Sequence, residues 1–145
     1  MPRRELGSYI DRTYKIVRQD LINRFKEEGV DLTPEQWVVV SKLKTDGKMY
    51  QTDLANLTFR DKPTVSRIVD LLVRKNMVAR ERDQKDGRKF FISLTHHGKK
   101  VVKKAYPAVE ASRELGWTNL SEEEYTLLIK LLDKIFINYI NDREN

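Results

Sequence analysis

Basic and hydroxyl side chains gather at two places in the middle of the chain, and both places suit contact with a nucleic acid. Lys62, Thr64 and Arg67 lie close together in one segment, and Lys85 and Arg88 lie in a second. Ammonium and guanidinium groups bind phosphate oxygens, and Arg, Lys and Thr side chains also form hydrogen bonds with base edges. The chemistry predicted for these residues is recognition of double-stranded DNA.

The first group lies at the start of a predicted helix. Asp61 is the expected N-cap of this helix, and a proline in the first turn costs little because its missing N–H group would have no helical partner there. Four apolar residues recur at the spacing of one helical face, which we expect to be buried: Val65, Ile68, Val69 and Leu72. The residues that we expect to contact DNA at this helix start are Lys62, Pro63, Thr64, Ser66 and Arg67.

The second group lies at the tip of a predicted β-hairpin. Two short strands are expected at residues 78–83 and 89–94, and the segment between them holds the Asp-Gly turn signal at Asp86. Lys85 and Arg88 then fall at the tip of the hairpin, where they are the expected DNA contacts of a wing.

A short helix is predicted just upstream, at residues 51–57, and a few residues separate it from the helix that starts near Lys62. This spacing is typical of a helix-turn-helix. Together with the hairpin, it predicts a winged helix-turn-helix over residues 31–94. The predicted fold class is mainly α with a small β wing.

This combination resembles the MarR family of bacterial transcriptional regulators. Two departures from the family pattern are visible: Asn76 stands where glycine is usual, a change that the backbone tolerates, and the lack of cysteine excludes the thiol-based peroxide-sensing subtype. The residues that carry the resemblance follow the family's order along the chain: Leu32-Thr33-Pro34-Glu35-Gln36-Trp37, Asp53-Leu54-Ala55, Val65-Ser66-Arg67 with Asp70 and Leu72, Val78 and Arg80, Asp83, Asp86 and Arg88, and Leu94-Thr95 with Gly98.

The resemblance implies both an architecture and a function. The architecture is a single domain, 1–145, in which dimerisation helices at 1–30 and 95–145 flank the winged helix-turn-helix. The function is sequence-specific transcriptional regulation, with repression as the expected sense, by a homodimer that binds pseudo-palindromic operators. The recognition helix would lie in the major groove and the wing at the flanking minor groove or backbone. A small aromatic or amphipathic acid is the ligand that the resemblance suggests for releasing the DNA.

The terminal helices carry more apolar side chains than one small domain can cover. Helical patterns extend over residues 5–28 and 95–115 and again from residue 121 onward. A two-fold dimer would bury this excess and would set two recognition helices about 34 Å apart, one turn of DNA. The expected interface residues are Ile10, Val17, Leu21, Leu128, Leu132, Ile135 and Tyr139.

Two helix starts show the pattern of a capping box, in which a hydroxyl residue and an acid or amide three positions later bind each other's backbone N–H groups. Thr33 with Gln36 predicts the start of one helix, and Ser121 with Glu124 predicts the start of the last one. The core of the first of these helices is expected to include Trp37.

Composition excludes several functions. The chain has 145 residues, a formal net charge of +6 and no cysteine, so neither a disulfide nor a thiolate metal site is expected. Adjacent His96 and His97 point in different directions on a helix and cannot share a metal. No cofactor and no enzymatic activity are predicted, since no phosphate-cradling glycine loop or nucleophile motif is found. No apolar run reaches the roughly 18 residues of a membrane span, and the expected location is the cytoplasm.

Some alternatives stay open at this point. Arg67 has Asp61 and Asp70 as possible ion-pair partners, and Arg88 has Asp86. The basic cluster, defined as Lys99, Lys100, Lys103 and Lys104, fits either a surface that flanks DNA or an ordinary solvated helix face. A winged helix can also serve protein–protein assembly without binding DNA, and fold alone does not separate the two functions.

Overall fold

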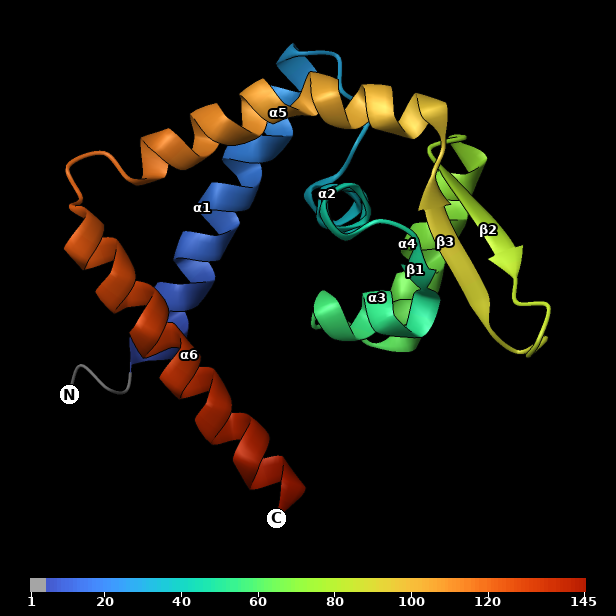
Figure 1. Ribbon diagram of the computed structural model, residues 1–145. Helices are drawn as coiled ribbons and strands as arrows, with labels where there is room; N and C mark the ends of the chain where they lie inside the picture. The colour runs from blue at the N-terminus through green and yellow to red at the C-terminus, as the bar shows by residue number, and fades with distance from the viewer. Residues whose placement is uncertain (1–4) are drawn as a thin grey trace. The chain divides into compact units, whose positions relative to one another are not determined.

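The computed structural model describes residues 5–145. Its Cα positions divide the chain into two compact units, the first ending at Ser112 and the second running from Arg113 to Asn145, and the expected single domain stays a prediction. The described elements are α1 (Leu6–Glu27), α2 (Pro34–Asp46), β1 (Met49–Tyr50), α3 (Gln51–Leu57), α4 (Lys62–Arg74), β2 (Val78–Arg82), β3 (Phe90–Leu94), α5 (His96–Gly116) and α6 (Glu122–Glu144) (Figure 1).

The strands form one antiparallel sheet in the order β1-β3-β2. In the hairpin, Val78 lies opposite Leu94 and Arg82 opposite Phe90, while β1 pairs with the other edge of β3. Each hairpin strand is one residue shorter than predicted. The backbone N–H group of Asp83 still donates to the carbonyl oxygen of Lys89 at 2.9 Å, so the pairing continues into the wing loop.

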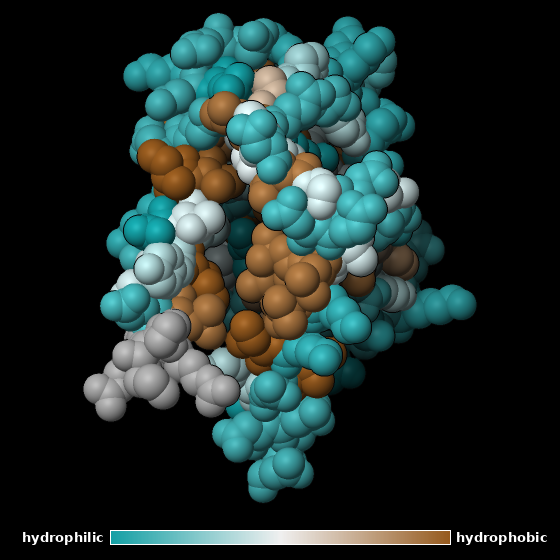
Figure 2. Space-filling view, turned by 90° about the vertical axis from the view of Figure 1, so that its left-hand side faces the viewer, coloured by the Kyte–Doolittle hydropathy of each residue, from teal (hydrophilic) through white to brown (hydrophobic). Residues whose placement is uncertain are grey.

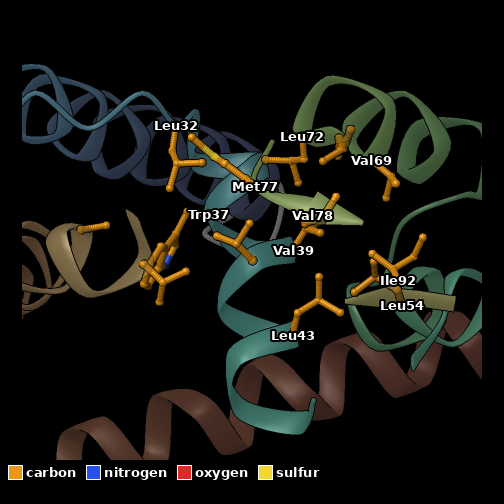
Figure 3. Close-up of a cluster of buried hydrophobic side chains, with 14 of the residues drawn as sticks. Leu32, Trp37, Val39, Leu43, Leu54, Val69, Leu72, Met77, Val78 and Ile92 are labelled. Carbon is orange, nitrogen blue, oxygen red and sulfur yellow. The ribbon is translucent and has the colours of Figure 1, made fainter. Parts of the chain in front are cut away.

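The core of the first unit forms around α2. The rings of Phe25 and Tyr106 pack edge-on against Trp37, with centroid distances of 6.2 and 5.4 Å. Figure 3 shows Val39 and Leu43 of α2 among side chains from α4 and the sheet. The apolar face predicted for α4 is confirmed, since all four of its residues are buried: Val65, Ile68, Val69 and Leu72.

The predicted helix starts are confirmed. The Thr33 and Gln36 side chains each accept the other residue's backbone N–H at 3.1 Å, and the same reciprocal pair joins Ser121 and Glu124. Asn76 follows α4 with a φ of +58°, the left-handed conformation that asparagine tolerates at the end of a helix.

The second unit consists of the end of α5, a short connection and α6. The ring of Trp117 packs edge-on against Tyr125 with a centroid distance of 4.7 Å. None of the described residues of α6 is buried. Between residues 5 and 145, no helix combines the length and the apolar character needed to cross a membrane.

Candidate nucleic-acid interface

The start of α4 is held by its N-cap residue. The Asp61 carboxylate accepts the backbone N–H of Thr64 at 2.8 Å and the hydroxyl of the same residue at 2.9 Å. These hydrogen bonds lower the pKa of Asp61 below its usual value, the backbone bond most strongly. Because this end of the helix is fixed, the exposed side chains of Lys62 and Arg67 project from a defined position.

Arg67 does not form the ion pair with Asp70 that was one of its alternatives. The Asp70 carboxylate lies 2.7 Å from a guanidinium nitrogen of Arg80, on β2. Arg67 instead donates to the hydroxyl of Thr64 at 3.4 Å, a long and exposed bond. The Arg67 guanidinium therefore remains accessible to a nucleic acid.

Arg80 on β2 contacts residues of α3, α4 and β3. Besides its ion pair with Asp70 on α4, its Nε donates to the side-chain oxygen of Gln51 at the start of α3, at 3.2 Å. It also lies over the Phe90 ring, 5.9 Å from the centroid. The sequence pattern placed Arg80 at the start of the first wing strand but indicated none of these partners.

The wing loop is organised by two aspartates. Asp83 accepts the backbone N–H of Lys85 at 2.9 Å, and Asp86 accepts that of Arg88 at 3.1 Å. Among the described residues, the glycines with positive φ are Gly29 and Gly47, so Gly87 does not supply the left-handed conformation of a two-residue Asp-Gly turn. The tip is instead a longer loop in which short polar side chains replace strand hydrogen bonds.

Arg88 forms the ion pair with Asp86 that the sequence left open, with its Nε 3.3 Å from the carboxylate. The Arg88 side chain is nevertheless 92% exposed. Ion pairs this exposed contribute little free energy, so a DNA phosphate can compete for the guanidinium.

The helix start and the wing meet at one hollow. This hollow has a volume of about 110 Å³ and is lined by Gln51, Thr52, Lys62, Arg88, Lys89 and Phe90. It therefore joins two predicted DNA contacts that lie 26 positions apart in the sequence. Thr52 and Lys89 were not among the residues predicted to contact DNA, although the helix start at residue 51 and the basic run at the hairpin tip were signals for both.

The basic cluster of α5 lies at the opposite end of this unit. The 13 residues of α4 carry the chain about 20 Å from the helix start at a rise of 1.5 Å per residue. At that far end Thr95, which precedes α5, binds the carbonyl oxygen of Asn76 through its hydroxyl at 2.6 Å. Figure 1 shows the start of α5 and the wing loop at opposite ends of the hairpin. The cluster therefore does not flank the surface formed by Lys62 and Arg88.

A second hollow, of about 320 Å³, lies between α2 and α5 and is lined by Lys44, His96, Lys99, Lys100, Lys103 and Tyr106. Most of the basic cluster thus faces this hollow. Within residues 5–145, no group of three or more His, Cys, Asp and Glu side chains is placed to hold a metal ion.

The predicted dimer residues differ in exposure. Ile10 and Val17 of α1 are exposed, whereas Leu21 is half-buried against the core of its own chain. On α6, Leu128, Leu132 and Tyr139 are exposed and Ile135 is half-buried. The interface that they were expected to form stays a prediction.

Comparison with known proteins decides the family. The family model described as "MarR family" matches residues 32–90. The transcriptional regulator HosA of Escherichia coli O127:H6 is 30% identical over 112 residues, which are 77% of this chain and 83% of HosA. The chain belongs to the MarR family. It is a transcriptional regulator, as the resemblance implied, and not an enzyme.

Solved structures of MarR-family proteins agree with the fold. A mutant of MarR from Escherichia coli in complex with operator DNA superposes with a TM-score of 0.81 at 23% identity, over 90% of this chain and 92% of that one. BpsR of Bordetella bronchiseptica, whose DNA binding is regulated by 6-hydroxynicotinic acid, superposes with a TM-score of 0.81 at 25% identity, over 90% of this chain and 91% of that one. The predicted winged helix-turn-helix fold is therefore confirmed.

Proposed function

We propose that this MarR-family regulator is a sequence-specific repressor that binds pseudo-palindromic operators as a homodimer in the cytoplasm. The main support for this proposal is the hollow between the start of α4 and the wing, because Lys62 and Arg88 line it together on one exposed surface. A single surface of this kind can contact the major groove and the adjacent backbone at once.

The two parts of this surface have different roles. Lys62, Pro63, Thr64, Ser66 and Arg67 lie on the helix start and contact base edges and the nearest phosphates. By contrast, Lys85 and Arg88 lie on the wing and act through phosphates or the shape of the minor groove. The helix start therefore sets sequence preference and the wing adds affinity.

The homodimer rests on the exposed apolar side chains of the terminal helices. Figure 2 shows brown, apolar side chains exposed among hydrophilic ones on the surface that it draws. Exposed apolar area on this scale usually marks an interface. The exposed large apolar residues of α6 include Leu127, Leu128, Leu131, Leu132, Phe136 and Tyr139, and those of α1 include Tyr9, Ile10, Tyr14 and Val17.

Control by a small aromatic acid is supported by the hollow between α2 and α5. Lys44, Lys99 and Lys103 offer ammonium groups to a carboxylate, and Tyr106 offers a ring for stacking. Such a ligand shifts DNA binding only if it prefers one arrangement of the recognition helices over the other. The regulation of BpsR by 6-hydroxynicotinic acid gives the chemical class to screen first.

The DNA-binding proposal is tested by selecting bound fragments from a genomic DNA pool and then measuring variants. Arg67→Ala removes a base contact, so affinity for the selected site should fall by about 1–3 kcal/mol and discrimination at one position should relax. Arg88→Ala removes a phosphate contact, so affinity should fall on all sequences and the salt slope should drop by about one unit. Lys99→Ala removes the same charge at the far end and is the control.

Two results would contradict this proposal. If the wild-type protein selects no sequence, it is not a sequence-specific regulator, and a winged helix used for protein assembly becomes the better reading. If Arg67→Ala and Lys99→Ala behave alike, the surface has been assigned to the wrong residues.

The dimer is tested by sedimentation at low micromolar concentration. Ile135→Asp places a charge in the proposed interface, and we expect it to give monomer or aggregate and to abolish operator binding. Asn141→Asp adds the same charge to an exposed polar position of α6 and should leave the dimer intact. A wild-type protein that binds its operator tightly as one chain per site would contradict the dimer.

A further inference from the structure

An aromatic pair ties the wing to the strand that precedes the helix-turn-helix. Tyr50 and Phe91 are register partners across β1 and β3, and their rings stack with centroids 4.2 Å apart and planes inclined by 20°. Lys48 lies over the Phe91 ring at 4.5 Å from its centroid. Since Tyr50 is also the residue immediately before α3, this pair connects the wing sheet directly to the first helix of the motif.

The Tyr50 hydroxyl extends this connection into the wing loop. It donates to Oδ2 of Asp83 at 2.7 Å, while Oδ1 of the same carboxylate accepts the backbone N–H of Lys85 at 2.9 Å. The backbone N–H of Asp83 in turn donates to the carbonyl oxygen of Lys89. The bond lowers the pKa of Asp83 and raises that of Tyr50, as expected when a phenol donates to a carboxylate. The Tyr50 hydroxyl is thus linked, through the Asp83 carboxylate, to the backbone of the loop that carries Lys85 and Arg88.

One cation of the wing also contacts the Tyr50 ring. Lys89 Nζ is 5.0 Å from the Tyr50 ring centroid, a cation–π distance. Lys89 and Arg88 also line the hollow beside the start of α4. A change in the angle of the wing would therefore move the cations away from the helix start, where DNA is expected.

We propose that Tyr50 is a positioning residue: its hydroxyl bond to Asp83 holds the wing loop at the angle at which Arg88 and Lys89 meet the DNA backbone. This role rests on the proposed DNA-binding function. A loop that is ordered before binding has less conformational entropy to lose on the DNA, so affinity rises without any added contact. Tyr50 itself does not touch DNA in this scheme.

The test uses Tyr50→Phe, which removes the hydroxyl and keeps the stacked ring. Without DNA, trypsin should cleave the wing loop after Lys85, Arg88 or Lys89 several-fold faster than in the wild type. Tyr125→Phe, an exposed tyrosine on α6 that keeps its ring contact with Trp117 in this variant, is the control and should leave this rate unchanged. Asp83→Ala should also speed cleavage, and the double variant should be little faster than Asp83→Ala alone, because both changes break one connection.

With the selected operator, Tyr50→Phe should lower affinity by about 2- to 10-fold, the range that corresponds to one hydrogen bond. The salt slope should stay unchanged, because the phosphate contacts still form once DNA is bound, whereas Arg88→Ala should reduce that slope. In an Arg88→Ala background, the effect of Tyr50→Phe should shrink.

The outcomes separate this inference from the proposed function. Equal trypsin rates for Tyr50→Phe and wild type would overturn the positioning role whether or not the protein binds DNA. Faster cleavage with unchanged operator affinity would overturn its link to DNA binding. A uniform loss of thermal stability with no change specific to the wing would also overturn it, since the hydroxyl would then serve the fold alone. If wild type selects no DNA, the proposed function fails while the trypsin experiment still reports on the connection.

Discussion

Helices α2 and α6 begin in the same way but differ in what they bury. Each starts with a capping box whose two hydrogen bonds measure 3.1 Å. Five residues of α2 are buried: Gln36, Trp37, Val39, Val40 and Leu43. None of the described residues of α6 is buried, although its sequence is rich in large apolar side chains. Local sequence thus starts both helices, but α2 buries five side chains within its compact unit, whereas the described residues of α6 bury none.

This difference suggests two sources of stability. The first unit has its own core and should unfold cooperatively whatever the protein concentration. Helix α6 gains little from burial within one chain, and helices that lack packing are marginal in water. We infer that much of the stability of α6 comes from a second copy of the chain, so it should depend on concentration.

The largest expected effect comes from removing an apolar side chain in each region. Leu72 is fully buried, so Leu72→Ala should lower the free energy of unfolding by about 2–5 kcal/mol at every concentration. Leu132 is 40% exposed in the single chain. Leu132→Ala should therefore act mainly by weakening the dimer, and its lower melting temperature should recover as protein concentration rises. Thermal and chemical denaturation at several protein concentrations measures both losses of stability. If the two variants depend on concentration in the same way, the two regions do not differ in their source of stability.

A smaller effect is expected from glycine substitution. A Cβ on Gly98 would overlap the carbonyl oxygen of Met77, where α5 packs against the start of β2. Gly98→Ala should cost about 1–3 kcal/mol, because backbone must move to make room. A Cβ on Gly116 meets no atom within 4 Å, so Gly116→Ala is the matched control and should be neutral or slightly stabilising. Similar thermal melts of the two variants would show that the close approach at Gly98 is not required.

The capping boxes provide the next test. Thr33→Ala and Ser121→Ala each remove an acceptor for a backbone N–H group, and each should cost about 1 kcal/mol. For Thr33 the loss should be the same at all protein concentrations. For Ser121 it should appear as a weaker dimer, measured by sedimentation. A loss at Ser121 that does not depend on concentration would mean that α6 folds stably in the single chain.

The smallest effect concerns pH. Two hydrogen bonds, at 2.7 and 3.0 Å, link Arg18 of α1 to Glu35 of α2, and they lower the pKa of Glu35 below its usual value. The stabilisation is therefore complete above the pKa of Glu35 in the unfolded chain and is lost as pH falls through the lower folded value. Glu35→Gln should be less stable than wild type at pH 6, and the difference should shrink towards pH 3. A difference that does not vary with pH would contradict the ion pair.

Features that depend on residues close together in the chain could be predicted from the amino-acid sequence. Asp61 caps α4 through the residue three positions later, and both capping boxes have the same spacing. The buried face of α4 follows from helical periodicity alone, because residues three and four apart lie on one side. For the same reason, the expected contacts Lys62 and Arg67 appear where they were predicted, exposed at the helix start.

Contacts between residues far apart in the chain could not be predicted in this way and are known from the folded structure. Arg80 takes Asp70 and Gln51 as partners, the latter 29 positions away, and thereby leaves Arg67 accessible. From the sequence, the basic cluster of α5 fitted either a surface that flanks DNA or a solvated helix face. In the folded chain, β3 runs back from the wing and α5 begins at the far end of α4, so the cluster lies away from Lys62. Charge and periodicity report which side chains are exposed, but not where an exposed side chain lies. That is set by long-range strand pairing and helix packing, whose geometry no local pattern encodes.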